Sequence, residues 1–208
     1  MPCPASRVAA LAACVLMALS LACEEKKPEG EAPSRFASVK RDSGNKAASS
    51  FCERQFPLGE GGKRYTAPPD RPIPGVAADA AAPKAGAWRW VNLWATWCAP
   101  CVEEMGLLQR WKSSLTADGV NIEFELWSLD DEEAALTGWL QKHTLPGRAR
   151  WLRSQEDLGP FLTTLGADAS SAIPIHAFVD GAGNLRCLRV GAVHDEDYGA
   201  IKAMLTGS

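Results

Sequence analysis

An α/β domain, with a central sheet flanked by helices, is the fold class that the sequence predicts for residues 87–208. Residues 88–95 (WRWVNLWA) form a continuous apolar run, which is typical of a buried strand. From Pro100 to Leu115 the apolar residues recur at helical spacing. The runs 175–180 and 185–193 are separated by the turn signal GAGN, which predicts a β-hairpin. Strands that alternate with helices indicate a layered α/β arrangement.

The remaining elements complete this pattern. Residues 122–130 (IEFELWSLD) predict a second strand, and residues 131–143 predict a helix with acidic residues in its first turn. A weaker helical stretch covers residues 156–166, with Gly166 as its stop signal, and residues 195–207 predict a closing helix. The predicted order of elements is therefore βαβα(α)ββα.

Length and charge exclude several classes of protein. A chain of 208 residues with 46% hydrophobic composition can bury one proper core, and a second full domain is not expected. The formal net charge of −3 provides no basic footprint for nucleic acid and no strongly polybasic patch for a membrane surface.

The N-terminus predicts export. Arg7 is followed by an apolar run, Val8 to Ala22, that is too short to span a membrane comfortably and that stops at Cys23. This arrangement resembles a bacterial lipoprotein signal, in which Cys23 would be lipidated. An earlier match ending at Cys14 leaves only a short apolar run, and an ordinary cleaved signal or an uncleaved anchor is the alternative. Glu24 after the cysteine favours the outer membrane over the inner one.

Four segments follow from this reading. Residues 1–22 are a signal peptide, and residues 23–50 mix both charges with Pro, Gly and Ser, which predicts a flexible tether. Residues 51–86 are still rich in Pro and Gly but contain apolar residues, so we expect an N-terminal extension that packs on the domain. Residues 87–208 are the domain itself.

Export changes the meaning of the seven cysteines, because disulfides persist outside the cytoplasm. Two cysteines leave with the signal and one carries lipid. The mature chain keeps an even set, which allows two bridges: Cys52, Cys98, Cys101 and Cys187. We expect a structural Cys52–Cys187 disulfide beside a redox-active Cys98–Cys101 pair.

The CxxC motif carries the chemistry. Cys98 and Cys101 lie one helical turn apart at a strand-to-helix junction, and Pro100 suits a helix start. The helix N-terminus stabilises the Cys98 thiolate, which can attack a disulfide, and Cys101 can then resolve the mixed disulfide. A zinc site is the alternative for a CxxC motif, but no second ligand pair follows and the histidines lie far apart: His143, His176 and His194. We expect no metal and no cofactor.

The surrounding residues carry a resemblance. The segments VNLWATWCAPC (91–101) and IPIHAFVDGAGNLRCLRVGA (173–192) resemble the thioredoxin superfamily, and within it the exported TlpA/ResA-like branch of bacterial disulfide reductases. The resemblance covers residues 88–208 and implies a thioredoxin fold with a central mixed sheet. It also implies a cis peptide bond before Pro174, which would face the CxxC motif and expose the Ile173 backbone to a substrate strand.

The same resemblance singles out an acid–base candidate. Asn92 stands where cytoplasmic thioredoxins keep a buried Asp, and this branch often has a Glu three residues past the second cysteine instead, which is Glu104 here. A carboxylate one turn from Cys101 can exchange its proton. The alternative is a solvated helix face, as we expect for Glu103, and Gly106 departs from the Pro that the family commonly has.

Aromatic residues surround the motif. Trp97 would shield one side of Cys98 and offer a contact surface to a partner, with simple packing as the alternative. His176 lies two residues after Pro174 on a predicted buried strand, and we interpret it as a core or cleft histidine rather than an acid–base catalyst. We expect five further tryptophans to lie in or near the core: Trp90, Trp94, Trp127, Trp139 and Trp151.

The resulting prediction is an exported reductase of client disulfides, with the thiols of apocytochromes c or of copper-site proteins as the clients that the resemblance implies. The partners would be proteins with disulfides, a membrane or periplasmic electron donor, and the membrane through the lipid anchor. A DsbA-like oxidant is the first alternative, although the uncharged dipeptide between the cysteines favours reduction. A Sco-like copper module is the second, and its CxxxC spacing differs from the CxxC here.

Overall fold

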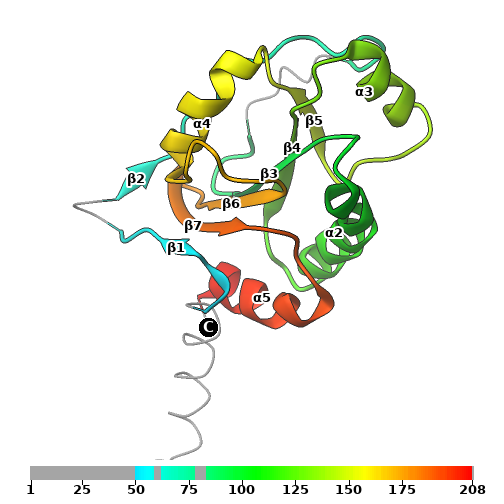
Figure 1. The fold of residues 1–208 in the computed structure, drawn as a ribbon. Coiled ribbons are helices and arrows are strands. Elements are labelled where there is room, and N and C mark those ends of the chain that lie inside the picture. The colour runs from blue at the N-terminus through cyan, green and yellow to red at the C-terminus, as the bar shows by residue number, and fades with distance from the viewer. Residues whose placement is uncertain (1–49, 59–61, 78–82, 208) are drawn as a thin grey trace, which may run out of the picture. The chain divides into compact units, whose positions relative to one another are not determined.

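A mixed sheet of seven strands forms the centre of the fold (Figure 1). The computed structural model describes residues 50–58, 62–77 and 83–207, which belong to a compact unit of residues 35–208. The predicted signal peptide and nearly all of the predicted tether lie outside the described residues. None of the helices in the described ranges is both long and apolar enough to cross a membrane.

The strands follow the order β1-β7-β6-β3-β4-β5, and β2 also pairs with β7. In the centre β3 (Trp88–Trp94) runs parallel to β4 (Ile122–Ser128) and antiparallel to β6 (Ile175–Val179). The last strand, β7 (Asn184–Val190), pairs antiparallel with β6 through the predicted hairpin. The predicted fold class, a thioredoxin fold with a mixed sheet flanked by helices, is therefore confirmed.

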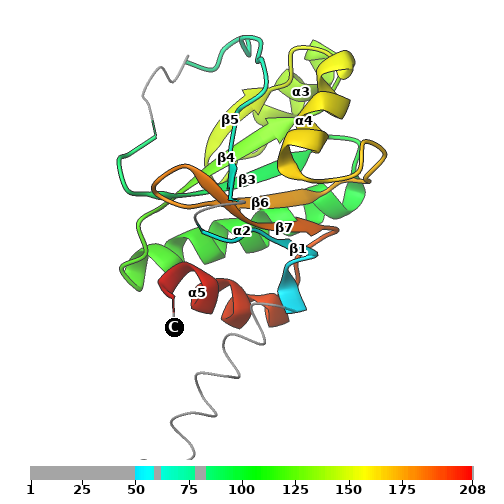
Figure 2. The ribbon, with the colours of Figure 1, turned by 90° about the vertical axis from the view of Figure 1, so that its left-hand side faces the viewer.

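Helices cover both faces of this sheet. In Figure 2, α2 and α5 lie below the sheet and α4 lies above it. Short 3-10 turns precede α4 and α5, and Gly166, with φ of 80°, ends α4 in the left-handed region as a helix stop should. The helices have these bounds: α2 Ala99–Ala117, α3 Glu133–Leu140, α4 Leu158–Leu165 and α5 Tyr198–Thr206.

The predicted order of elements is wrong at one place, because it omits β5 (Arg148–Trp151). This strand pairs parallel with β4 at the edge of the sheet, where three of its four residues are half-buried. Its sequence, RARW, has arginines at alternate positions, and Arg150 forms an ion pair with Asp70 at 2.9 Å. A polar edge strand of this kind lacks the apolar run by which the buried strands were predicted.

The first part of the N-terminal extension packs against the opposite edge. Its strands β1 (Arg54–Gln55) and β2 (Lys63–Arg64) both pair antiparallel with β7. Phe51 contacts Phe178 edge-on, with ring centroids 5.9 Å apart. Tyr65 is buried farther along the extension, and its burial raises the pKa of the phenol well above the ordinary value.

An aromatic cluster fills the core between the sheet and α2. The Trp90 ring is fully buried and stacks on Phe124, with centroids 4.8 Å apart, and also contacts Trp111 of α2. Of the tryptophans expected in or near the core, Trp90, Trp94, Trp127 and Trp151 are buried, while Trp139 is half-buried against Trp94. These large rings fix the distance of α2 from the sheet and so the position of its first turn.

Candidate active site

Cys98 and Cys101 lie at the first turn of α2, directly beyond the end of β3. Cys98 is the N-cap residue, its backbone N–H donates to the Ala95 carbonyl at 3.1 Å, and Pro100 occupies the first helical turn. The two sulfur atoms are bonded, so the structure represents the oxidised form. In the reduced form a Cys98 thiolate would lie at the positive end of a 19-residue helix, which lowers the pKa of a thiol.

A buried carboxylate holds the loop that leads to Cys98. Asp130 is 2% exposed and accepts hydrogen bonds from the Thr96 backbone N–H at 3.1 Å and from the Thr96 hydroxyl at 2.6 Å. Its other oxygen accepts from the Ser128 hydroxyl at 2.7 Å. Sequence reasoning missed this residue, although its position at the end of a strand parallel to β3 places it beside the same loop.

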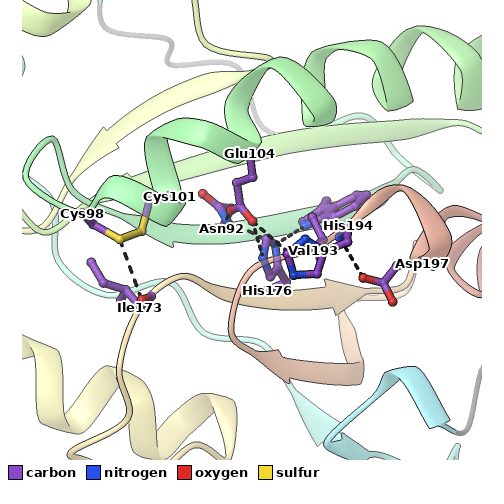
Figure 3. A network of polar contacts seen from close by, with 10 residues as sticks. Asn92, Cys98, Cys101, Glu104, Ile173, His176, Val193, His194 and Asp197 are labelled. Atoms are coloured by element: carbon purple, nitrogen blue, oxygen red, sulfur yellow. Dashed lines mark hydrogen bonds and ion pairs between the residues drawn. A yellow bond between two sulfur atoms is a disulfide. The ribbon is translucent and has the colours of Figure 1, made fainter.

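The Ile173–Pro174 peptide bond is cis, and it faces the redox pair. The Ile173 carbonyl oxygen lies 3.8 Å from Cys98 Sγ (Figure 3). A disulfide sulfur has no hydrogen to donate, so this contact becomes a hydrogen bond only when Cys98 carries a thiol. The structure therefore brings together three of the residues singled out from the sequence, namely Cys98, Cys101 and Pro174.

An apolar groove of about 440 Å³ opens beside Cys98. Trp97 lies in its wall and is 68% exposed, so it is not a packed core residue. No charged side chain lines the groove. Its other wall residues come from the end of β4, from the α4 side and from the segment before the cis-proline: Leu129, Gln155, Leu158, Leu162, Ser171, Ala172 and Ile173.

Glu104 lies on the buried face of α2 and not on the solvated face. Only 3% of the residue is exposed, whereas neighbouring Glu103 is exposed. Its Oε1 accepts a hydrogen bond from Asn92 Nδ2 at 3.0 Å, and its Oε2 accepts one from the Val193 backbone N–H at 3.1 Å. His176 Nε2 lies 3.3 Å from the same Oε2 (Figure 3). The three polar groups that contact this carboxylate all present a nitrogen.

Glu104 also lines a second, more polar cavity of about 580 Å³ on the side of the residues that follow β7. Its walls include Pro100, Glu103, Arg110 and the segment 192–196. Glu104 therefore borders a cavity whose other walls, apart from Pro100, differ from those of the apolar groove.

Sequence reasoning undervalued His176. We expected a core histidine, and the side chain is fully buried, but it contacts Glu104, Asn92 and Trp90 in one polar network. The sequence carried no signal for these contacts, because they depend on the register that places His176 on β6 opposite Asn92 on β3. The contact with Glu104 depends in addition on how α2 packs against the sheet.

Two further sites singled out from the sequence lie elsewhere. A disulfide joins Cys52 to Cys187 over a sequence separation of 135, away from the groove, and it links the extension to β7. Cys23, the expected lipidation site, is outside the described residues. Within the described ranges, no three His, Cys, Asp or Glu side chains are grouped so that they could hold a metal ion.

A thioredoxin fold with a CxxC pair at a helix N-terminus and a cis-proline beside it defines the class of this protein, a thioredoxin-fold protein with a paired-cysteine site. The chain is 30% identical over 108 residues to the thiol:disulfide interchange protein DsbE homolog of Paracoccus denitrificans. The match covers 52% of this chain and 53% of that protein, so the chain spans about half the length of the relative. No protein-family model matches the sequence.

Solved structures give fold neighbours at low identity. The thioredoxin domain of a thiol-disulfide oxidoreductase from Bacteroides vulgatus is 16% identical, with a TM-score of 0.48 over 58% of this chain and 80% of that one. A thiol:disulfide interchange protein of the thioredoxin family from Chlorobium tepidum is 19% identical, with a TM-score of 0.47 over the same shares of the two chains.

Proposed function

We propose that this protein is an exported thiol-disulfide oxidoreductase that reduces disulfides in client proteins through Cys98 and Cys101. The observation that carries the proposal is the position of Cys98, at the N-terminus of α2 and 3.8 Å from the Ile173 carbonyl. There a thiolate is stabilised by the helix, and an extended client can pair with the backbone beside it.

Reduction of a client proceeds in two exchanges. The Cys98 thiolate attacks one sulfur of the client disulfide, forming a mixed disulfide and releasing the other client sulfur as a thiolate. Cys101 then loses its proton and attacks Cys98 Sγ, which releases the second client thiolate. Both client thiolates take up protons, two electrons pass to the client, and the protein is left with the Cys98–Cys101 disulfide described above.

Glu104 is the base that we assign to the second exchange. Cys101 is fully buried, so its proton has no direct path to water. Glu104 lies one helical turn farther along α2 and lines the polar cavity, so it can accept the proton and pass it to solvent there. The client can remain in the apolar groove while this transfer takes place.

The clients that we propose are exported proteins whose paired cysteines must be reduced before they bind haem or copper. The uncharged groove favours a client segment with apolar residues beside its cysteine. We also propose that Cys23 is lipidated and holds the protein on the periplasmic side of a bacterial membrane, with the outer membrane favoured. Replacement of Cys23 by Ala should then abolish incorporation of labelled palmitate and release the protein from membranes.

The reduction potential of the Cys98–Cys101 pair tests the direction of electron flow. Equilibration with glutathione buffers should give a value nearer to that of thioredoxin, about −270 mV, than to that of DsbA, about −120 mV. A value near the DsbA end would instead support an oxidant that forms disulfides. The matched control is a variant with both cysteines replaced by Ser, and failure of the reduced wild type to reduce any peptide disulfide faster than this control overturns the proposed activity.

A further inference from the structure

His176 is a fully buried histidine at the centre of the sheet, and all three of its polar neighbours belong to the network around Glu104. Trp90 Nε1 lies 3.1 Å from His176 Nδ1, and Asn92 Nδ2 lies 3.2 Å from the same ring nitrogen. On the other side of the ring, Nε2 faces Glu104 Oε2 at 3.3 Å. The ring therefore connects two neutral donors on β3 with a carboxylate on α2.

Trp90 determines which ring nitrogen carries the hydrogen. An indole N–H can only donate, so His176 Nδ1 must present its lone pair to Trp90. A neutral imidazole with a free lone pair on Nδ1 carries its hydrogen on Nε2, the atom that faces Glu104. The Asn92 amide agrees with this assignment, because its nitrogen contacts Nδ1 and also donates to Glu104 Oε1 at 3.0 Å.

Glu104 Oε2 is the acceptor within reach of the Nε2–H group. In the oxidised structure Nε2 is buried without a well-aligned hydrogen bond, although Glu104 Oε2 is only 3.3 Å away. A small rotation of either side chain completes the bond. Because an unpaired N–H in a protein interior is costly, this rotation is favoured whenever Glu104 is charged.

We propose that His176 is a positioning residue for Glu104: Trp90 holds it as the Nε2–H tautomer, and its Nε2–H group orients the carboxylate. This inference rests on the proposed role of Glu104 as the base for Cys101. His176 is not a proton relay, because a hydrogen on Nδ1 would be directed at the N–H groups of Trp90 and Asn92.

The elements packed around His176 bring neutral and charged side chains toward it. Arg189 on β7 lies directly across from it in register, with its guanidinium over the Phe51 ring. From α2 the Glu104 carboxylate faces it at 3.3 Å, and from β3 the neutral side chains of Trp90 and Asn92 contact it. After β7 the backbone of Val193 reaches Glu104, while the next two side chains are exposed. Glu104 is therefore the group on which His176 acts directly.

Nitrogen-15 correlation spectra of the wild-type protein test the tautomer without any mutation. We expect the His176 ring to show an unprotonated Nδ1 and a protonated Nε2 at neutral pH, because the Trp90 indole N–H can only donate to Nδ1. A hydrogen on Nδ1 overturns the inference.

Kinetics of the second exchange test the positioning role. His176→Leu removes the Nε2–H donor to Glu104, so the pH midpoint of client release should move upward by about one unit. His176→Gln, which can still donate an amide N–H to Glu104, should restore most of the wild-type profile. Trp90→Phe keeps an aromatic ring but removes the indole N–H, so the hydrogen of His176 should no longer be held on Nε2.

The outcomes separate this inference from the proposed function. If Glu104→Gln slows client release but His176→Leu leaves its pH profile unchanged, Glu104 is the base and the positioning role of His176 is wrong. If Glu104→Gln itself has no effect, the proposed role of Glu104 fails first. If His176→Leu does not fold, the Gln variant still decides the question, because it keeps a donor to Glu104 and should keep the wild-type pH profile of client release.

Discussion

Cys98 Sγ lies 3.8 Å from the carbonyl oxygen of Ile173, the residue that precedes the cis-proline. The two atoms come from segments that are 75 residues apart in the sequence. One segment is the first turn of α2 and the other leads into β6, and both adjoin β3, so the sheet determines their distance. A client that pairs with the Ile173 backbone is thereby placed beside the attacking sulfur.

Cys101→Ser should convert the protein into a trap for its clients. Cys98 would still attack a client disulfide, but the attack that releases the client would be missing, so mixed disulfides should accumulate. Non-reducing gels and mass spectrometry of captured proteins measure this. Partners with CxxCH motifs support a role in cytochrome c maturation, and partners with copper-ligand cysteines support the metal-site role.

Cys98→Ser is the matched control for the trap. Cys101 is fully buried and cannot meet a client directly, so this variant should capture little. Equal trapping by both variants would contradict the assignment of Cys98 as the nucleophile.

Glu104→Gln should slow the second exchange more than the first at neutral pH. Glutamine cannot take a proton from Cys101, and its amide NH₂ would replace one carboxylate oxygen and so face either Asn92 Nδ2 or the Val193 N–H, both of which are donors. Stopped-flow measurements should therefore show normal formation of the mixed disulfide and release slowed by about 10- to 100-fold. Identical pH–rate profiles for the variant and the wild type would show that the buried carboxylate has only a structural role.

The sequence predicted the parts of this fold that carry strong local patterns. The apolar run of β3 and the helical spacing of α2 were found within one or two residues of their observed ends. The strand β5 was missed because its alternating arginines hide an edge strand whose pairing depends on β4. Two-residue strands such as β1 have no periodicity of their own and exist only because β7 offers them an edge.

The site divides in the same way. Residues close together in the sequence, such as the CxxC pair and Glu104, could be singled out from spacing and resemblance. The network around His176 could not be singled out, because it depends on the register of β6 with β3 and on the distance of α2 from both strands. Asp130 was missed for the same reason, because its partner Thr96 lies in the loop after β3, whereas Asp130 follows β4.

Asp118→Asn should make stability less dependent on pH in the acid range. The Lys202 ammonium, 2.8 Å from Asp118, holds the pKa of that carboxyl below its usual value of 3.8. A depressed pKa means that the contact stabilises the fold above about pH 4 and that this stabilisation is lost as the pH falls through the folded-state value. The effect should be small, because both side chains are partly exposed.

The measurement for Asp118 is denaturant unfolding at several pH values. The wild type should be slightly more stable than the variant at neutral pH, and the two unfolding curves should converge in acid. High salt should reduce the difference at neutral pH. A difference that grows as the pH falls would have the wrong sign for this ion pair.

Removal of the second disulfide should destabilise the protein without altering the redox pair. Cys52 joins Cys187 across a sequence separation of 135, so the bridge closes a long loop in the unfolded chain and reduces its entropy. The double variant Cys52→Ala and Cys187→Ala should lower the free energy of unfolding by about 3 to 5 kcal/mol. The double replacement is required because a single free thiol could exchange with the Cys98–Cys101 disulfide.

Hydrogen exchange should locate this loss of stability. The backbone amide of Phe56 donates to the Arg186 carbonyl at 3.0 Å, and this bond lies beside the pairing of β1 with β7. In the double variant its amide should exchange faster than amides of β3 and β4, since the extension opens before the central sheet. The reduction potential of Cys98–Cys101 should stay unchanged, because the bridge lies away from the groove. Uniform acceleration of exchange across all strands would instead show that the bridge stabilises the whole domain and not its edge.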